Sequence, residues 1–322
     1  MPSVIRIGTR KSRLAMIQSE LAAEAIRRAA PDTVVEMIPV TTKGDRVLDR
    51  SLIEIGGKGV FTKELEELLL EGKADIAIHS AKDLPAETAD GLEVVPILPR
   101  AAVNDVVLTV SGTVLRELPA GAAVGTSSLR RELQVRRLCP QAEIRSLRGS
   151  VPTRIEKLRN GEYDAILLAA AGVERLGIAA GVQPAGGTAG SAGTGAPLSP
   201  GPVRDIFFEY LDPAQFLPAA GQGILAAEVR RGEYRELLRM LSPRETRLAF
   251  TAERTFMTAI GGSCNAPCGA YCEKGKDGML LLRGMYAEDA VTPEYRTAEC
   301  RPEETAAAEA AEELAAAFLQ KH

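Results

Sequence analysis

The chain has 322 residues and a formal net charge of −4 at pH 7. This length predicts two or three domains, and the slight negative charge argues against a general binder of nucleic acid or other polyanions. No apolar run reaches the roughly 18 residues that a membrane span needs, and no signal-peptide pattern precedes the first predicted strand. The five cysteines are too unevenly spaced for a disulfide framework, so we expect a cytoplasmic protein.

The first 100 residues alternate strands with helices. We predict strands at residues 4–8, 34–39 and 74–78, helices at residues 14–29 and 62–70, and a further apolar run at residues 92–98. This alternation is typical of a parallel sheet. A strand within residues 216–230 is expected to return to the same sheet.

The strand at residues 74–78 leads into the first candidate site. His79, Ser80, Lys82 and Asp83 follow it directly. Open α/β sheets place ligand chemistry at the carboxyl ends of their strands. Asp83 could steer a proton or stabilise a developing cation, or it could only pair with Lys82. No nucleophile elbow supports a Ser-His-Asp triad around His79.

A second set of strands and helices begins after residue 101. We predict strands at residues 105–109, 122–125, 144–147 and 164–169, and helices at residues 129–138, 152–158 and 171–176. Residues 185–202 are rich in Gly, Ala and Pro, and they predict a flexible surface insertion without chemistry.

The pattern changes after residue 233. We predict helices at residues 236–241, 245–259 and 303–320, and antiparallel strands at residues 279–285 and 295–300. The predicted fold is therefore α/β, with two α/β domains and a smaller C-terminal α+β domain. The predicted domains are residues 1–100 with 214–230, residues 101–203, and residues 233–322.

Six arginines follow predicted strands or open predicted helices. They are Arg10, Arg130, Arg131, Arg148, Arg154 and Arg175. In open α/β sheets such positions share one rim, where guanidinium groups and helix N-termini both favour anions. Each arginine alone is more simply a solvated surface residue, but their joint placement indicates a carboxylate or phosphate site.

Two glycine-containing segments are further candidates. Thr126 and Ser128 could offer donors to an anion at a helix start or only cap that helix, and the segment lacks the pattern of a P-loop. Cys264 lies in a glycine-rich loop between a helix and a strand, where a thiol is accessible. Cys264, Cys268 and Cys272 are evenly spaced, but they fit no common metal-ligand run and lack histidine partners, so we expect no metal.

The chain resembles the porphobilinogen deaminase (hydroxymethylbilane synthase) family over nearly its whole length. The resemblance rests on RIGTRKSRLA, TTKGD, GGKGVFTKELE, ADIAIHSAKDLP, VGTSSLRR, LRGSVPTR, LAAAGVERLG, LPAAGQG and GGSCNAPCGAY, in that order. It implies two domains like type II periplasmic binding proteins and a third domain that carries the cofactor on a loop. It also implies a transferase of tetrapyrrole biosynthesis that acts as a monomer, without nucleic acid or membrane partners.

The resemblance further implies the reaction and its cofactor. Four molecules of porphobilinogen are joined head to tail with loss of ammonia on a dipyrromethane primer, and hydrolysis releases hydroxymethylbilane. The dipyrromethane cofactor is expected on Cys264 through a thioether. A non-catalytic solute-binding module on the same scaffold would explain the arginines, but it would explain neither Cys264 nor Asp83.

The motif match also assigns individual roles. The catalytic residues are expected to be Asp83 and Lys82. The cofactor-binding residues are expected to be Cys264, Ser12, Lys82, Asp83, Thr126, Ser128, Arg130, Arg131 and Arg148. The substrate-binding residues are expected to be Arg10, Ser12, Gln18, Lys58, Phe61, Arg148, Arg154 and Arg175. Glu54, the insertion at residues 185–202 and Cys268 depart from the family pattern.

Overall fold

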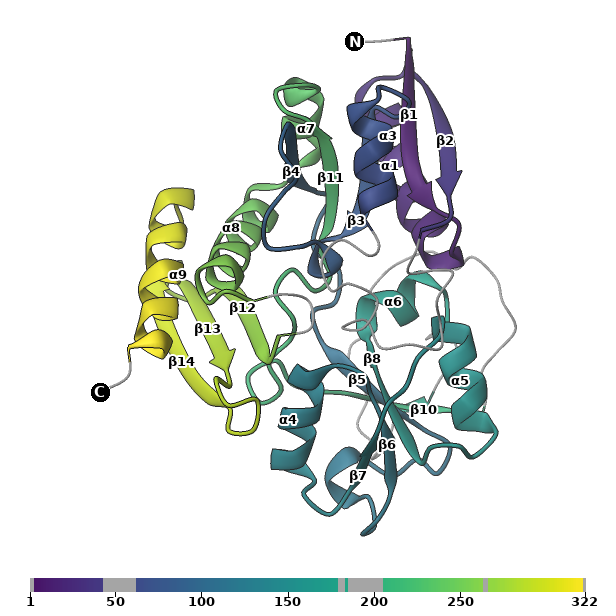
Figure 1. Cartoon of the computed structure of the whole chain (residues 1–322), viewed down its shortest axis with the longest axis vertical. Helices are drawn as coiled ribbons and strands as arrows, with labels where there is room; N and C mark the ends of the chain where they lie inside the picture. The colour runs from purple at the N-terminus through teal and green to yellow at the C-terminus, as the bar shows by residue number, and fades with distance from the viewer. Residues whose placement is uncertain (1–2, 43–61, 179–182, 185–204, 263–265, 321–322) are drawn as a thin grey trace. The chain divides into compact units, whose positions relative to one another are not determined.

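The computed structural model describes residues 3–42, 62–178, 183–184, 205–262 and 266–320. The chain divides into two compact units (Figure 1). Unit 1 comprises Met1–Ala101, Ala219–Tyr286 and Glu294–His322, and unit 2 comprises Ala102–Pro218 and Ala287–Pro293. The predicted first and third domains therefore belong to one unit. Lys58, Phe61, Glu54, Cys264 and the insertion at residues 185–202 lie outside the described residues.

The first sheet of unit 1 is mixed. Its strands are β1 (Val4–Arg10), β2 (Val34–Val40), β3 (Ile76–Ser80), β4 (Leu92–Ile97) and β11 (Leu225–Arg230), in the order β2-β1-β3-β11-β4. Strand β1 runs parallel to β2 and β3, whereas β11 lies antiparallel between β3 and β4. The predicted return of residues 216–230 to this sheet is confirmed. The expected parallel sheet is mixed because β11 enters from a distant part of the chain in the opposite direction.

Helices α1 (Arg13–Ala29), α3 (Lys63–Leu70) and α7 (Arg235–Leu241) accompany this sheet. Their apolar positions recur at helical spacing, so each helix buries one face. Leu65 and Leu69 of α3 are fully buried, as are Ile5 and Ile7 of β1. The carboxyl end of β3 continues into the short 3₁₀ helix η1 (Ala81–Asp83), and the buried side chain of Ala81 anchors η1 to the core.

Unit 2 contains the second α/β sheet. Its strands are β5 (Asp105–Thr109), β6 (Ala123–Gly125), β7 (Glu143–Arg145), β8 (Ala165–Ala169), β9 (Gln183–Pro184) and β10 (Phe207–Tyr210), in the order β7-β6-β8-β5-β10-β9. The helices are α4 (Leu129–Leu138), α5 (Val151–Arg159) and α6 (Ala170–Arg175), with a 3₁₀ turn η2 (Leu115–Glu117). Strand β10 lies beyond the predicted domain end at residue 203. It is short and only half apolar, so its pairing with β5 depends on tertiary structure.

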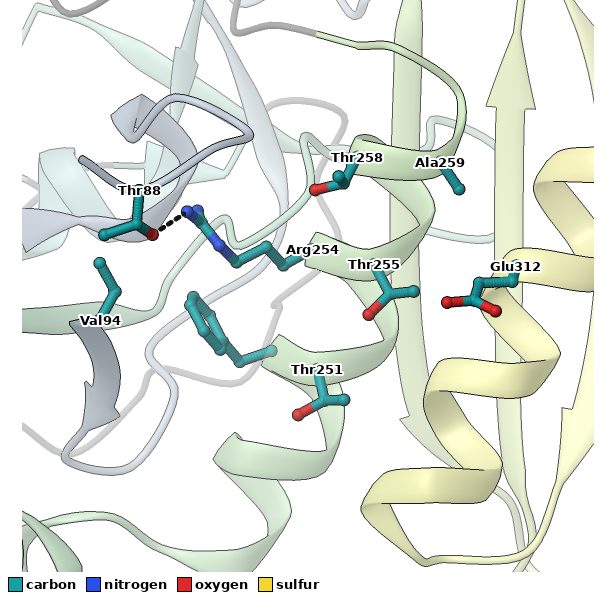
Figure 2. Close-up of a pocket in the computed structure, with 9 residues that line it drawn as sticks. Thr88, Val94, Thr251, Arg254, Thr255, Thr258, Ala259 and Glu312 are labelled. Carbon is teal, nitrogen blue, oxygen red and sulfur yellow. Dashed lines mark hydrogen bonds between the residues drawn. The ribbon is translucent and has the colours of Figure 1, made fainter. Parts of the chain in front are cut away.

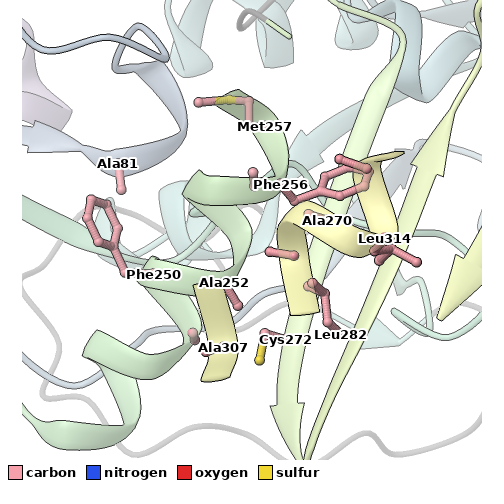
Figure 3. Close-up of a cluster of buried hydrophobic side chains, with 14 of the residues drawn as sticks. Ala81, Phe250, Ala252, Phe256, Met257, Ala270, Cys272, Leu282, Ala307 and Leu314 are labelled. Carbon is pink, nitrogen blue, oxygen red and sulfur yellow. The ribbon is translucent and has the colours of Figure 1, made fainter. Parts of the chain in front are cut away.

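The C-terminal part of unit 1 is the smaller α+β domain. It comprises α8 (Arg244–Ala259), the antiparallel strands β12 (Cys268–Lys274), β13 (Leu280–Tyr286) and β14 (Glu294–Cys300), and α9 (Glu304–Leu319). Phe256, Leu282 and Leu314 fill its core (Figure 3). The same buried cluster continues through Phe250 to Ala81, so this domain packs against η1.

The sheets and helices confirm the predicted fold class, with two α/β sheets and a smaller C-terminal α+β domain. No helix among the described residues is long and apolar enough to cross a membrane.

Candidate active site

The carboxyl end of β3 presents the predicted catalytic residues. Asp83 is the last residue of η1 and its side chain is exposed. Lys82 is half-buried, and its Nζ atom lies 3.5 Å from Oε1 of Gln222, whose side chain is completely buried. The structure therefore places an exposed carboxylate on a short helix whose neighbouring lysine contacts the protein interior.

A loop at residues 219–223 packs against the backbone of η1. Gly221 has φ +74°, and a Cβ atom there would lie 2.9 Å from Cβ of Ala81 and 3.1 Å from the backbone nitrogen of Lys82. Only glycine accommodates both this backbone conformation and this close approach. The backbone N–H of Ala81 also donates to the carbonyl of Ile224 at 3.0 Å. The loop thus fixes the start of η1.

Glu253 of α8 holds this loop through a buried carboxylate. Oε1 accepts from Nη1 of Arg100 at 2.6 Å and from the N–H of Cys272 at 2.8 Å. Oε2 accepts from Nη2 of Arg100 at 3.0 Å and from the N–H of Gly221 at 2.7 Å. Nε of Arg100 donates to the carbonyl of Gln222 at 2.9 Å. Sequence reasoning missed the roles of Glu253 and Arg100, although the Gly-Gln-Gly pattern of the LPAAGQG motif signals a tight backbone contact.

Helix α1 brings further predicted residues to the same strand end. The buried Gln18 donates through Nε2 to Oγ of Ser80 at 2.9 Å. Ser12 is the N-cap of α1 and accepts from the N–H of Ala15 at 3.3 Å. Arg10 ends β1, which pairs with β3. Unit 1 therefore groups Arg10, Ser12 and Gln18 around the strand that leads to Asp83.

His79 contacts a carboxylate rather than a nucleophile. Its Nε2 atom lies 3.0 Å from Oε2 of Glu228 on the adjacent strand β11, and both side chains are buried. The hydroxyl of the next residue, Ser80, accepts a hydrogen bond from Gln18. The pair joins the adjacent strands β3 and β11, so His79 helps to hold β3 in the sheet.

In unit 2, Arg130 and Arg131 are buried rather than solvated. Both form ion pairs with Asp105, at 2.8 Å and 2.7 Å, and their side chains also reach the carbonyls of Leu217 and Leu167. Burial raises the pKa of the Asp105 carboxyl, but the two arginines outweigh burial and hold that pKa well below its ordinary value. The paired arginines thus anchor α4 to the start of β5.

The other predicted residues of unit 2 are less enclosed. Nη1 of Arg148 is buried and has no hydrogen-bond partner among the residues that the structure describes. Arg154 donates through Nε to the carbonyl of Gly149 at 2.8 Å. Burial lowers the pKa of Arg175 to about 10, and Glu174 partly opposes this shift. Arg175 therefore remains a cation at neutral pH.

Thr126 and Ser128 order the start of α4. Oγ1 of Thr126 accepts from the N–H of Ser128 at 3.1 Å, and Ser128 caps the helix by accepting from the N–H of Arg131 at 3.5 Å. The capping interpretation of these residues is thus correct, and an anion-binding role stays a prediction.

Two family models match the chain. "Porphobilinogen deaminase, dipyromethane cofactor binding domain" matches residues 5–237, and "Porphobilinogen deaminase, C-terminal domain" matches residues 247–320. The porphobilinogen deaminase of Chromobacterium violaceum is 42% identical over 285 residues, which cover 88% of this chain and 84% of that protein. The porphobilinogen deaminase of Syntrophobacter fumaroxidans is 43% identical over 286 residues, with the same shares covered.

Solved structures of other proteins align more loosely. The periplasmic aliphatic sulphonate binding protein SsuA of Escherichia coli is 13% identical, with a TM-score of 0.41, and the alignment covers 80% of this chain and 71% of that chain. The family models, by contrast, span both α/β domains and the α+β domain, and the relatives match over most of their own length. The chain therefore belongs to the porphobilinogen deaminase family, a family of tetrapyrrole biosynthesis with a dipyrromethane cofactor.

Proposed function

We propose that this protein joins four porphobilinogen molecules head to tail, with loss of ammonia at each step, and releases hydroxymethylbilane by hydrolysis. The observation that carries the proposal is the placement of Asp83. It is an exposed carboxylate on a 3₁₀ helix that Gly221, Gln222 and the buried core hold in place. Preorganised charge of this kind stabilises a cation that develops during a reaction.

Asp83 is the proposed catalytic carboxylate. Loss of ammonia from an aminomethylpyrrole leaves an azafulvenium cation, whose charge is shared with the ring nitrogen. A carboxylate beside the pyrrole N–H stabilises that charge. Lys82, held by Gln222, is proposed to donate to a substrate carboxylate next to Asp83. The rigid support matters because a displacement of about 1 Å at a reacting group can slow a reaction roughly 100-fold.

The residues fit a dipyrromethane cofactor. Such a group carries carboxylate side chains, and the buried Nη1 of Arg148 is a donor without a hydrogen-bond partner among the described residues. A buried donor left unpaired costs about 1–3 kcal/mol, which a carboxylate acceptor would recover. When bound, the cofactor supplies a pyrrole carbon as the nucleophile. We propose that Arg148, Arg130, Arg131, Ser12, Thr126 and Ser128 bind its carboxylates.

Cys264 is the proposed attachment point. Cys139, Cys268 and Cys272 are buried, and Cys300 is partly buried. Desolvation raises the pKa of the thiols of Cys139, Cys272 and Cys300. A thiol with a raised pKa is a poor nucleophile. Cys268, the nearest alternative, is buried at the start of β12. These observations support Cys264, which the GGSCNAPCG motif places at the family's position.

The remaining predicted residues are proposed to bind the acetate and propionate groups of porphobilinogen. They are Arg10, Ser12, Gln18, Lys58, Phe61, Arg148, Arg154 and Arg175. Arginine suits this task because its planar fork binds carboxylate bidentately. We further propose that the protein works as a cytoplasmic monomer, without nucleic acid or membrane partners.

Intact-mass spectrometry of the purified protein tests the proposal. A dipyrromethane-sized adduct should map to Cys264, and Cys264→Ser should lack it while the matched Cys268→Ser variant retains it. An adduct on Cys268, or an active preparation with unmodified Cys264, would overturn the assignment. An unmodified and inactive protein would instead support the solute-binding alternative.

A further inference from the structure

A groove of about 560 Å³ lies over α8, outside the residues proposed for catalysis (Figure 2). The loop and strand after η1 contribute Thr88 and Val94 to one side, and α9 contributes Glu312 to the other. All lining residues belong to unit 1. We call this space the α8 groove. Its volume lies within the range of roughly 300–1,000 Å³ that small-molecule sites occupy.

Arg254 is the cation of the α8 groove. Its Nη2 atom donates to Oγ1 of Thr88 at 3.0 Å, and its guanidinium lies 5.7 Å from the ring centroid of Phe250. No ion pair joins Arg254 to a carboxylate among the described residues. Burial lowers the pKa of Arg254, and the charge of Glu228 partly opposes this shift. A partly desolvated guanidinium that lacks a bonded counter-ion favours an anionic ligand.

Three threonines form the floor of the groove. Thr251, Thr255 and Thr258 are spaced by four and three residues, so they share one face of α8. Threonine is a weak helix former, and this face of α8 is only partly covered. The hydroxyl of Thr258 donates to the carbonyl of Ala86 at 3.3 Å. Local choices that oppose the secondary structure are expected at functional positions. Here the short side chains keep the groove open, and Thr251 and Thr255 offer hydroxyl groups to a ligand.

The two ends of the groove differ in charge. Figure 2 shows Arg254 directed toward Thr88 on one side of the threonines and Glu312 on α9 on the other side. Val94 and Phe250 add apolar surface. A doubly charged phosphate would match only the end with Arg254. A short apolar chain with a carboxylate at one end and an amino group at the other matches both ends.

We propose that the α8 groove is a second binding site, for a small amino acid whose carboxylate contacts Arg254 and whose ammonium contacts Glu312. The proposed site adjoins the residues that support η1. Phe250 and Arg254 also line a smaller cavity against Ala81 and Gly221, immediately behind η1. A ligand that reorients Arg254 therefore changes the packing behind Asp83 and modulates turnover.

Isothermal titration calorimetry on the complete protein with its cofactor tests the proposal. The probes are unbranched ω-amino acids from glycine to 6-aminohexanoate, with butyrate and inorganic phosphate for comparison. One amino acid of intermediate length should bind most tightly. Arg254→Gln should weaken that binding by about 10-fold or more, because a charge-assisted hydrogen bond to the ligand carboxylate is lost. Glu312→Gln should remove the preference for the amino acid over butyrate.

Matched variants keep the test decisive. Arg28→Gln removes an exposed arginine of α1 and should leave binding unchanged. Thr255→Val deletes one hydroxyl with little change of volume, and it should weaken binding even if Arg254→Gln does not fold. Saturating probe should change the turnover of the unaltered protein but not that of Arg254→Gln. Binding by none of the probes, equal binding to Arg254→Gln, stronger binding of phosphate, or unchanged turnover would overturn the proposal.

Discussion

The buried carboxylate of Glu253 should stabilise unit 1 more than any surface charge does. It accepts four hydrogen bonds, two from Arg100 and two from the backbone of Gly221 and Cys272. Glu253→Gln keeps the shape of the side chain but turns one acceptor oxygen into a donor that faces other donors. Arg100 then loses its counter-charge while its side chain stays largely buried.

The expected loss follows from these contacts. Removing one partner of a buried ion pair costs about 3–5 kcal/mol, since the other charge remains desolvated. For a folded unit of this size, each kcal/mol lowers the melting temperature by roughly 2–4 °C, so Glu253→Gln should lower it by about 6–20 °C. Turnover should fall as well at temperatures where the variant is folded, because Gly221 supports the helix that carries Asp83.

Thermal unfolding followed by circular dichroism, together with turnover of porphobilinogen, provides the measurement. Glu273→Gln is the matched control, since Glu273 pairs with Arg283 on half-exposed strands and should contribute about 1 kcal/mol or less. The double variant Arg100→Met with Glu253→Met should recover only part of the stability, because no isolated charge remains but the N–H groups of Gly221 and Cys272 lose their acceptor. A melting temperature of Glu253→Gln within 2 °C of that of Glu273→Gln would refute this account of the Glu253 interactions.

Three further predictions test the candidate site and its support. Asp83→Asn should retain the fold and substrate binding but lose most turnover, and near-normal turnover would remove Asp83 from catalysis. Gly221→Ala should cost about 2–4 kcal/mol by denaturant unfolding, since φ is positive and Ala81 is in contact, whereas Gly161→Ala, with the same φ and open space, should cost only about 1–2 kcal/mol. Asp105→Asn should destabilise unit 2 at neutral pH by about 3–5 kcal/mol. Because the folded pKa of Asp105 is lowered, its contribution is present above the unfolded value of about 3.9 and disappears as pH falls below it. Denaturation curves of the two proteins should therefore converge under strongly acidic conditions, and a constant difference down to low pH would contradict the assigned ion pairs.

Local sequence patterns predicted most elements of this fold. The helix at residues 129–138 and the strand at residues 105–109 have the predicted bounds, and the antiparallel hairpin near the C-terminus is confirmed. These segments carry their own periodicity and caps. The family assignment is confirmed as well, because its motifs span the chain. The antiparallel insertion of β11 was not predicted, since hydrophobic patterning carries no information about strand order.

Sequence reasoning was weakest for charged residues whose partners are distant in the chain. Arg130 and Arg131 follow a strand as a ligand site would, but their ion pairs with Asp105, which precedes Arg131 by 26 residues, were not predicted. Glu253 lies on an amphipathic helix and would be solvated there, but Arg100 meets it from 153 residues away. Such pairings depend on tertiary contacts, so no local pattern distinguishes a buried ion pair from an exposed side chain.

Helix α8 links these observations. Glu253 holds the loop behind η1, while the next residue, Arg254, points into the α8 groove and also lines the small cavity against Ala81. The same helix ends at Ala259, five residues before Cys264. One helix therefore positions the support of the proposed catalytic carboxylate and precedes the proposed cofactor thiol in the sequence. A change that tilts α8 should then disturb turnover and cofactor attachment together, whereas Asp83→Asn should reduce turnover while the cofactor stays attached to Cys264.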